Sequence, residues 1–362
     1  MAGGAATALA VLWGMTAADS AAAPIRARSD PDAMRLLRNA ATAAQSTQYQ
    51  GTEFLTAWYS GTATTTSTVA VAHVPGDGTV VRNGQAGGAK GGTMGMTFEP
   101  DGAEVQPGLG GYTSRMLDLL ARNYTVVRSS DDWICGRAAQ VIEARRADGS
   151  AAGRFWIDQG TGIMLHRELL DRSGRTIVAA GFQDITISKP KAGGRGSAVP
   201  PTRPAGTFAL ATDPWDHIVP GSRLDALPGA GPDGTSWKVP RSLPGHLSLY
   251  VARETGSGEP VHLGYTDGLV TLSVFVQRGR LDIGKLSGWR RTTVAGRTVY
   301  ERSGRQYWRV WAARGQVYTV VADTAPDSSD AVVAALPRGG PGWWQRLDRG
   351  LHRVGSWANP FR

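Results

Sequence analysis

The sequence predicts two α+β domains, each built on an antiparallel sheet. Three observations lead to this prediction. The chain has 362 residues, enough for two ordinary domains with cores of their own. Residues 153–187 alternate between strand-like runs and glycine-containing turns, which is typical of three consecutive antiparallel strands. Residues 189–204 are rich in Pro, Gly and basic side chains without an apolar rhythm, which is typical of a domain boundary.

The three consecutive strands give the clearest pattern. They are expected at residues 153–158, 163–170 and 175–187, separated by turns at 159–162 and 171–174. Both faces of the middle strand carry apolar side chains, with Met164 on one and Leu165 on the other. Such a sheet either encloses a ligand cavity or is packed on its second face by a helix. If there is a cavity, we expect it to be lined by Phe155, Ile157, Met164 and Leu165.

Two helices and further strands complete the first domain, which we place at residues 29–188. Asp30 is a good N-cap and Pro31 suits a first helical turn, and apolar residues then recur three and four apart through 32–44. Residues 112–123 have the same spacing. The other strands are expected at 48–59, in the Ser/Thr/Val-rich stretch that ends at Val74, and at 79–82, 124–128 and 137–145.

The second domain is expected at residues 243–337, after a linker and irregular junction at 189–242. Its strands are predicted at 247–253, 262–265, 269–277, 290–294, 297–303, 307–313 and 316–322. A short capped helix that ends at Leu336 follows them. The domain is therefore a small antiparallel sheet with a terminal helix.

The first 23 residues predict export. They contain an apolar segment at Ala5–Ala18 and end in Ala21-Ala22-Ala23, which is typical of a signal peptide with a small-residue cleavage site. The alternative is an apolar N-terminus of another kind, because no Lys or Arg precedes Arg26. We expect the protein to be periplasmic or otherwise extracytoplasmic.

The last segment, residues 338–362, is basic and rich in tryptophan. Its apolar side chains follow a helical spacing, with arginines between them: Trp343, Trp344, Leu347, Leu351 and Val354. A helix of this kind lies on an anionic membrane or docks on its own domain. We therefore expect residues 339–362 to make either a peripheral membrane contact or a contact with the second domain.

The net charge of +9 suggests an anionic surface as partner. Export argues against nucleic acid, which leaves anionic lipid, a cell-wall polymer or an acidic protein. The alternative is that the positive charge only reflects an Arg-rich proteome and does not indicate a binding partner.

Nothing in the sequence indicates an enzyme. The six histidines are scattered, without the spacing of a zinc site, and no Gly-x-Ser-x-Gly elbow occurs. Glu168 and Asp171 are close in sequence, but Asp171 begins a turn, which is a common structural use of aspartate. We predict a binding protein with no catalytic residues, no metal and no cofactor.

Short motifs occur in a fixed order across both domains. In the first domain they are Tyr49-Gln50-Gly51-Thr52, Gly136-Arg137, Arg154-Phe155-Trp156-Ile157-Asp158 and Thr161-Gly162. In the second domain Tyr265-Thr266-Asp267-Gly268-Leu269 runs into a strand at 272–276. Together they resemble the RseB/MucB family of extracytoplasmic sigma-factor regulators, over about residues 30–188 and 243–337.

This resemblance implies a fold and a function. The first domain would be a large curved antiparallel sheet, wrapped as a half-barrel over helices like the carriers LolA and LolB, around an apolar cavity. The protein would bind the extracytoplasmic segment of a membrane-embedded anti-sigma factor and control its regulated proteolysis, with a lipid-like ligand as the signal. The alternative is a lipid or lipoprotein carrier, although a carrier would not need the second domain.

The second-domain motif supplies the partner-binding candidates, Tyr265 and Asp267. They precede a strand on a turn, where a loop can present side chains to a partner. The alternative is a hairpin turn in which Asp-Gly is chosen for its backbone conformation.

Overall fold

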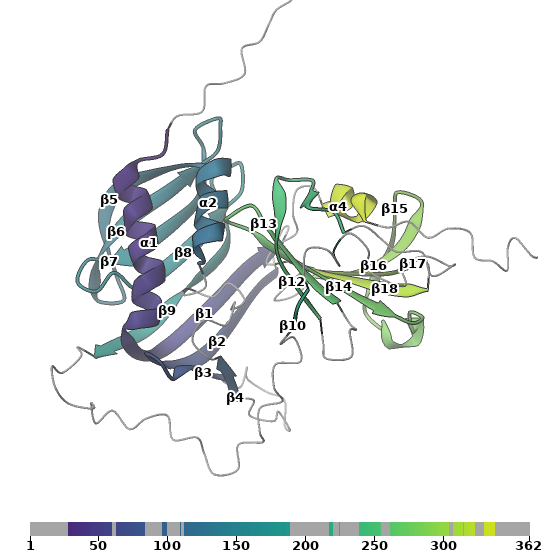
Figure 1. The fold of residues 1–362 in the computed structure, drawn as a ribbon, viewed down its shortest axis with the longest axis horizontal. Helices are drawn as coiled ribbons and strands as arrows, with labels where there is room; N and C mark the ends of the chain where they lie inside the picture. Colours follow the sequence, from purple (N-terminus) through teal and green to yellow (C-terminus); the bar gives the residue numbers. More distant parts are fainter. Residues whose placement is uncertain are drawn as a thin grey trace, which may run out of the picture.

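The computed structural model describes residues 28–59, 63–83, 96–99, 109, 112–188, 217–219, 224, 239–254, 261–303, 307–313, 315–322 and 329–336. These residues form two α+β domains with separate hydrophobic cores. Figure 1 shows the domains side by side, with helix α2 of the first domain next to the second domain. Among the described residues, no helix is long and apolar enough to cross a membrane.

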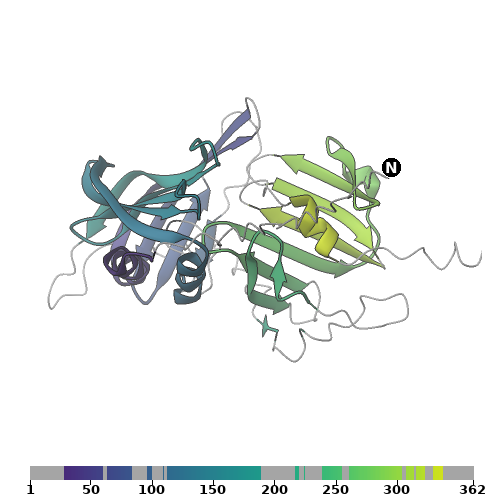
Figure 2. The same ribbon diagram turned by 90° about the horizontal axis from the view of Figure 1, so that it is seen from above.

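The first domain is one antiparallel sheet with two helices. Its elements are α1 (Pro31–Ser46), β1 (Gln48–Tyr59), β2 (Ala63–Val74), β3 (Gly78–Asn83), β4 (Met96–Glu99), α2 (Ser114–Asn123), β5 (Thr125–Ile134), β6 (Arg137–Arg145), β7 (Ala151–Asp158), β8 (Met164–Leu170) and β9 (Thr176–Ser188). The nine described strands follow the order β4-β3-β2-β1-β9-β8-β7-β6-β5, which is open at both edges. Figure 2 shows the sheet curving over the two helices, so the predicted half-barrel is confirmed.

Capping residues set where both helices begin. The Asp30 side chain accepts a hydrogen bond from the Asp32 backbone N–H, and Pro31 occupies the first turn of α1. Thr113 accepts from the Met116 N–H at the start of α2. The apolar side of each helix is buried in the first core, through Leu37 in α1 and residues such as Met116 in α2. Burial of these apolar faces holds the helices against the sheet.

The turn between β7 and β8 is held by a buried carboxylate. Asp158 is 3% exposed, and its oxygens accept from Arg137 at 2.7 and 3.0 Å. The Thr161 N–H and hydroxyl also donate to Asp158, at 2.7 and 2.6 Å. Burial alone would raise the pKa of Asp158, but the hydrogen bonds from Arg137 and Thr161 outweigh it and lower that pKa. Two motifs of the family resemblance, around Arg137 and Asp158, thus meet in one ion pair.

The second domain is a smaller sheet with a terminal helix, as predicted. Its elements are β10 (His217–Ile218), β11 (Ser242–Leu243), β12 (Leu247–Glu254), β13 (Val261–Thr266), β14 (Thr271–Arg278), η1 (Ile283–Lys285), β15 (Arg290–Val294), β16 (Arg297–Ser303), β17 (Tyr307–Ala313), β18 (Gln316–Ala322) and α4 (Ser329–Ala335). The described strands follow the order β10-β12-β13-β14-β18-β17-β16-β15, and β11 also pairs with β12.

The second domain begins earlier in the chain than expected. Within the predicted junction at 189–242, β10 pairs with β12, and Val219, Leu224 and Val239 are buried in the second core. Residues 189–216, 220–223 and 225–238 of that junction lie outside the described residues, as do the predicted signal peptide (1–23) and the basic tail (338–362).

Candidate functional site

Helix α2 belongs to the first domain and also contacts the second domain. One side of α2 packs into the first core, and the other side faces strand β12 of the second domain. Near the start of the helix, the Arg115 guanidinium donates to the backbone carbonyls of Leu249 at 2.8 Å and Tyr250 at 3.2 Å. The charged side chain therefore bonds directly to the backbone of the second domain.

The other end of α2 meets the turn between β13 and β14. Asn123 donates to the Asp267 carbonyl at 2.9 Å, and the Tyr124 hydroxyl donates to the Asp267 carboxylate at 2.7 Å. The second carboxylate oxygen of Asp267 accepts from the N–H groups of Leu269 and Val270, both at 2.8 Å. Burial raises the pKa of the Asp267 carboxyl, although these hydrogen bonds oppose the shift. Asp267 thus fixes the turn and joins it to the first domain.

This junction turn, residues 266–270, inserts into the first domain. Gly268 has a φ of +100°, and a Cβ there would lie 2.3 Å from the Leu120 backbone nitrogen. Only glycine allows the turn to approach α2 so closely. Leu269 is 2% exposed and belongs to the core of the first domain, where it lies against Gly153. The two domains therefore share a packed interface.

The two predicted partner-binding residues lie inside this interface and the second core. Tyr265 is fully buried and donates its hydroxyl hydrogen to the Pro240 carbonyl at 3.0 Å. Asp267 is 7% exposed. From the sequence we expect this turn to present its side chains to a partner. In the structure the turn packs against the first domain instead. The alternative of an Asp-Gly turn required by its backbone agrees with the positive φ of Gly268. A role of Tyr265 and Asp267 in partner binding stays a prediction.

A cavity of about 530 Å³ lies beside the junction, between α2 and the second domain. Its lining combines three arginines and one aspartate with apolar side chains from both domains: Arg115, Asp118, Leu119, Arg122, Val219, Leu224, Arg241, Ser248, Leu249, Tyr250, Val251 and Ala252. We call it the junction pocket. Sequence analysis missed it because its residues come from distant parts of the chain.

The four residues expected to line a cavity lie in the first core. Phe155, Ile157, Met164 and Leu165 are each at most 4% exposed. Phe155 meets the Tyr112 ring edge-on, with 5.6 Å between ring centroids. The Tyr112 hydroxyl in turn accepts from the buried Arg167 at 3.1 Å. The structure thus brings these residues together as packed core side chains, and their role in ligand binding stays a prediction.

Phe155→Ala separates a packing role from a cavity-lining role. A packed phenylalanine that is truncated to alanine costs about 3–5 kcal/mol, because transfer energy is lost and a void is left. We expect a loss of that size in the free energy of unfolding, measured by urea denaturation. A change below about 1 kcal/mol, within the range of surface substitutions, would instead indicate that the ring faces an open cavity.

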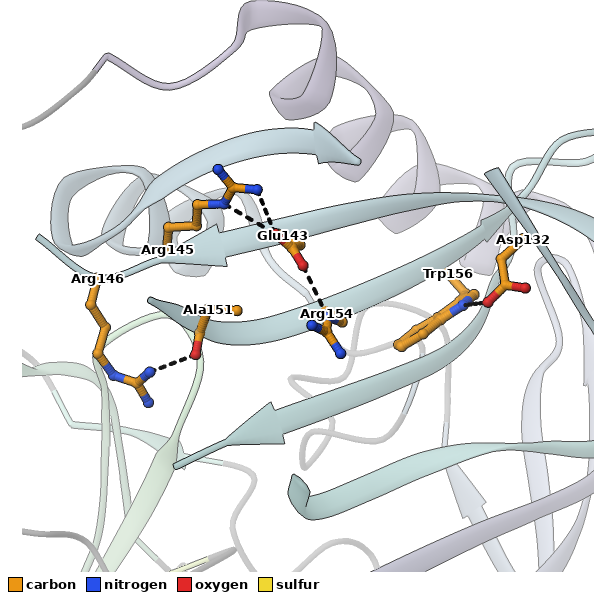
Figure 3. A network of polar contacts seen from close by, with 7 residues as sticks. All are labelled: Asp132, Glu143, Arg145, Arg146, Ala151, Arg154 and Trp156. Atoms are coloured by element: carbon orange, nitrogen blue, oxygen red, sulfur yellow. Dashed lines mark hydrogen bonds and ion pairs between the residues drawn. The ribbon is translucent and has the colours of Figure 1, made fainter. Parts of the chain in front are cut away.

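The outer face of the first sheet carries a polar network on β5, β6 and β7 (Figure 3). Glu143 accepts from Arg145 at 2.8 Å and from Arg154 at 3.0 Å, and the Trp156 indole N–H donates to Asp132 at 2.8 Å. Burial alone would raise the pKa of Glu143, but the two arginines outweigh it and lower that pKa. The network joins adjacent strands and gives the face an ordered, mixed-charge surface.

Next to this network, the His166 ring contacts two aromatic rings. Its ring centroid is 4.7 Å from Trp156 and 5.7 Å from Phe54, and its Nε2 is 3.3 Å from Glu168. Gly181 leaves room for the ring, since a Cβ there would lie 2.4 Å from its Nδ1. In the described part of the chain, no three His, Cys, Asp or Glu side chains are grouped to hold a metal ion.

Comparison with known proteins finds a family model that matches part of the first domain. Residues 97–202 match the family model of the MucB/RseB N-terminal domain. A crystal structure of MucB in complex with MucA(peri) is 19% identical with a TM-score of 0.44, and the match covers 85% of this chain and 100% of that chain. A Pseudomonas aeruginosa MucA/MucB complex is 20% identical with a TM-score of 0.44, and the match covers 85% of this chain and 100% of that chain. The lipoprotein LppX of Mycobacterium tuberculosis is 12% identical with a TM-score of 0.23, and the match covers 44% of this chain and 96% of that chain. No curated protein matches the chain.

The family match covers the part of the first domain that builds the described sites. It includes α2, whose residues form one wall of the junction pocket. It also includes strands β5 to β9, which carry the outer network and the Asp158 turn. The resemblance predicted from short motifs is thereby confirmed. Residues 97–202, which form much of the first domain, are thus similar to the MucB/RseB N-terminal domain.

Proposed function

We propose that this protein is an extracytoplasmic regulator that binds the extracytoplasmic segment of a membrane-embedded anti-sigma factor. Binding controls whether regulatory proteases cleave that partner. The observation that carries the proposal is the match of residues 97–202 to the family model of the MucB/RseB N-terminal domain. The resemblance to that family implies a partner of this kind, and the second-domain motif extends the resemblance beyond the matched residues.

The way the domains are joined supports a regulator over a lipid carrier. A carrier needs an open cavity in the first domain, whereas Phe155 and its predicted neighbours are packed in the core. The junction turn adds Leu269 of the second domain to that same core. The two domains therefore present one continuous surface to a partner. Specific protein–protein interfaces bury about 1,200–2,000 Å² in total, and we expect a contact of that size with the partner.

The test is a direct binding measurement. The chain without residues 1–23 is mixed with the extracytoplasmic segment of a single-span anti-sigma factor from the same organism. We expect co-elution in size-exclusion chromatography and a Kd of about 1 μM or tighter by isothermal titration calorimetry. A scrambled version of the segment is the control and should not bind.

Two results together would contradict the proposal. The first is that no anti-sigma segment of the organism binds. The second is that mass spectrometry finds a lipid bound stoichiometrically to the purified chain. That combination would assign the protein to the lipid carriers.

A further inference from the structure

We infer that the junction pocket binds an acidic segment of the protein partner, with at least one carboxylate held by its arginines. This inference rests on the proposed function, and it names the surface at which the partner docks. Neither the predicted partner-binding residues nor the predicted cavity residues line this pocket.

One face of α2 supplies half of the pocket. Arg115, Asp118, Leu119 and Arg122 are spaced three and four residues apart, so they lie on the same side of the helix. The residues that α2 buries in the first core, such as Met116 and Leu120, lie on its other side. The helix therefore packs its own domain with one face and offers a charged face to the pocket.

The second domain supplies the opposite wall. Residues Ser248 to Ala252 of β12 line this wall, together with Arg241, which lies just before β11. Val219 and Leu224 add apolar surface. The pocket is complete only when the two domains are docked, so a ligand that binds there favours the docked arrangement.

The charge of the lining selects an anion. Three arginines and one aspartate surround the cavity, and Arg115 is fixed in place by its bonds to the Leu249 and Tyr250 carbonyls. Each terminal nitrogen of a guanidinium carries two N–H groups, so this arginine can bond to the wall and to a ligand together. Guanidinium groups bind carboxylates through charge-assisted, often bidentate, hydrogen bonds. A partner carboxylate is therefore the natural occupant.

The apolar part of the lining favours a peptide as the source of that carboxylate. Leu119, Val219 and Leu224 are each at most 6% exposed and form a small apolar wall beside the arginines. This combination accommodates an acidic side chain and an apolar neighbour of one segment. A pocket that holds acyl chains is lined mainly by apolar side chains, whereas four of the twelve residues here are charged.

The test compares two double variants of the full chain that remove equal charge. In the pocket variant, Arg122→Gln and Arg241→Gln remove two exposed arginines of the pocket and leave Arg115 in place. In the control variant, Arg291→Gln and Arg302→Gln remove two exposed arginines of β15 and β16. Circular dichroism melting checks that both variants remain folded. The probes are the extracytoplasmic segment of the anti-sigma factor, the same segment with Asp and Glu changed to Asn and Gln, and phosphatidylglycerol vesicles.

We expect the pocket variant to bind the acidic segment at least about tenfold more weakly, because charge-assisted hydrogen bonds are lost. The control variant should change the Kd less than about threefold, as exposed charges contribute little. The amide segment should bind the wild type and the pocket variant with equal affinity. The inference is overturned if both variants bind the acidic segment like the wild type, or if the pocket variant loses only vesicle binding. Failure of the wild type to bind any segment would instead overturn the proposed function.

Discussion

Gly268→Val is expected to separate the two domains. The valine Cβ would have to occupy space 2.3 Å from the Leu120 nitrogen and 2.4 Å from its Cα, and backbone atoms of α2 cannot give way. The φ of +100° adds strain for a β-branched residue. Together these effects are expected to cost about 3 kcal/mol or more. Small-angle X-ray scattering should show a larger radius of gyration, and trypsin should cleave between the domains faster.

Gly315→Val is the matched control for this prediction. Gly315 also lies in the second domain with a positive φ, of +74°, but a Cβ there meets nothing within 4 Å. This variant should lose some stability from backbone strain and keep the wild-type radius of gyration. If both variants keep that radius, the junction turn does not hold the domains together.

Arg309→Ala is expected to destabilise the second domain by about 3–5 kcal/mol, the cost of breaking a buried ion pair by removing one partner. Arg309 is 6% exposed and donates to the buried Glu301 at 3.2 Å and to the Tyr307 hydroxyl at 2.7 Å. It also forms an ion pair with Asp330 on α4 at 2.7 Å. The substitution therefore leaves the buried Glu301 with only the exposed Arg290 and the Tyr307 hydroxyl among these partners, and it removes the ion pair to α4. Chemical denaturation followed by tryptophan fluorescence measures the loss.

Arg290→Ala tests whether burial is the cause. Arg290 pairs with the same Glu301, but its side chain is 79% exposed. Exposed ion pairs contribute at most about 1 kcal/mol, so this variant should unfold close to the wild type. If both variants lose the same free energy of unfolding, burial of the arginine is not the cause of the effect.

Much of the fold could be predicted because its signals are local. The alternation of apolar side chains and the glycine turns predicted β1, β6, β15 and β17 with the bounds that the structure has. β4 and β10 were not predicted, because strands of four and two residues are too short to show a periodic pattern.

The candidate site was harder to predict because its contacts are not local. Asp267 and Gly268 were recognised as a turn, but nothing near them in the sequence indicated Tyr124 or Leu120 as neighbours. The junction pocket joins residues more than 100 positions apart. Met164 and Leu165 did indicate an apolar surface on both sides of β8, and a packed core produces that pattern as well as a cavity does.

The rate at which the anti-sigma factor is cleaved tests the central claim most directly. The anti-sigma factor and its regulatory protease are reconstituted in the same vesicles, and cleavage is followed with and without the chain. If the chain shields its partner, a concentration ten times the Kd should slow cleavage about tenfold, because only the free partner is cut. An unchanged cleavage rate at concentrations that saturate binding would contradict the claim.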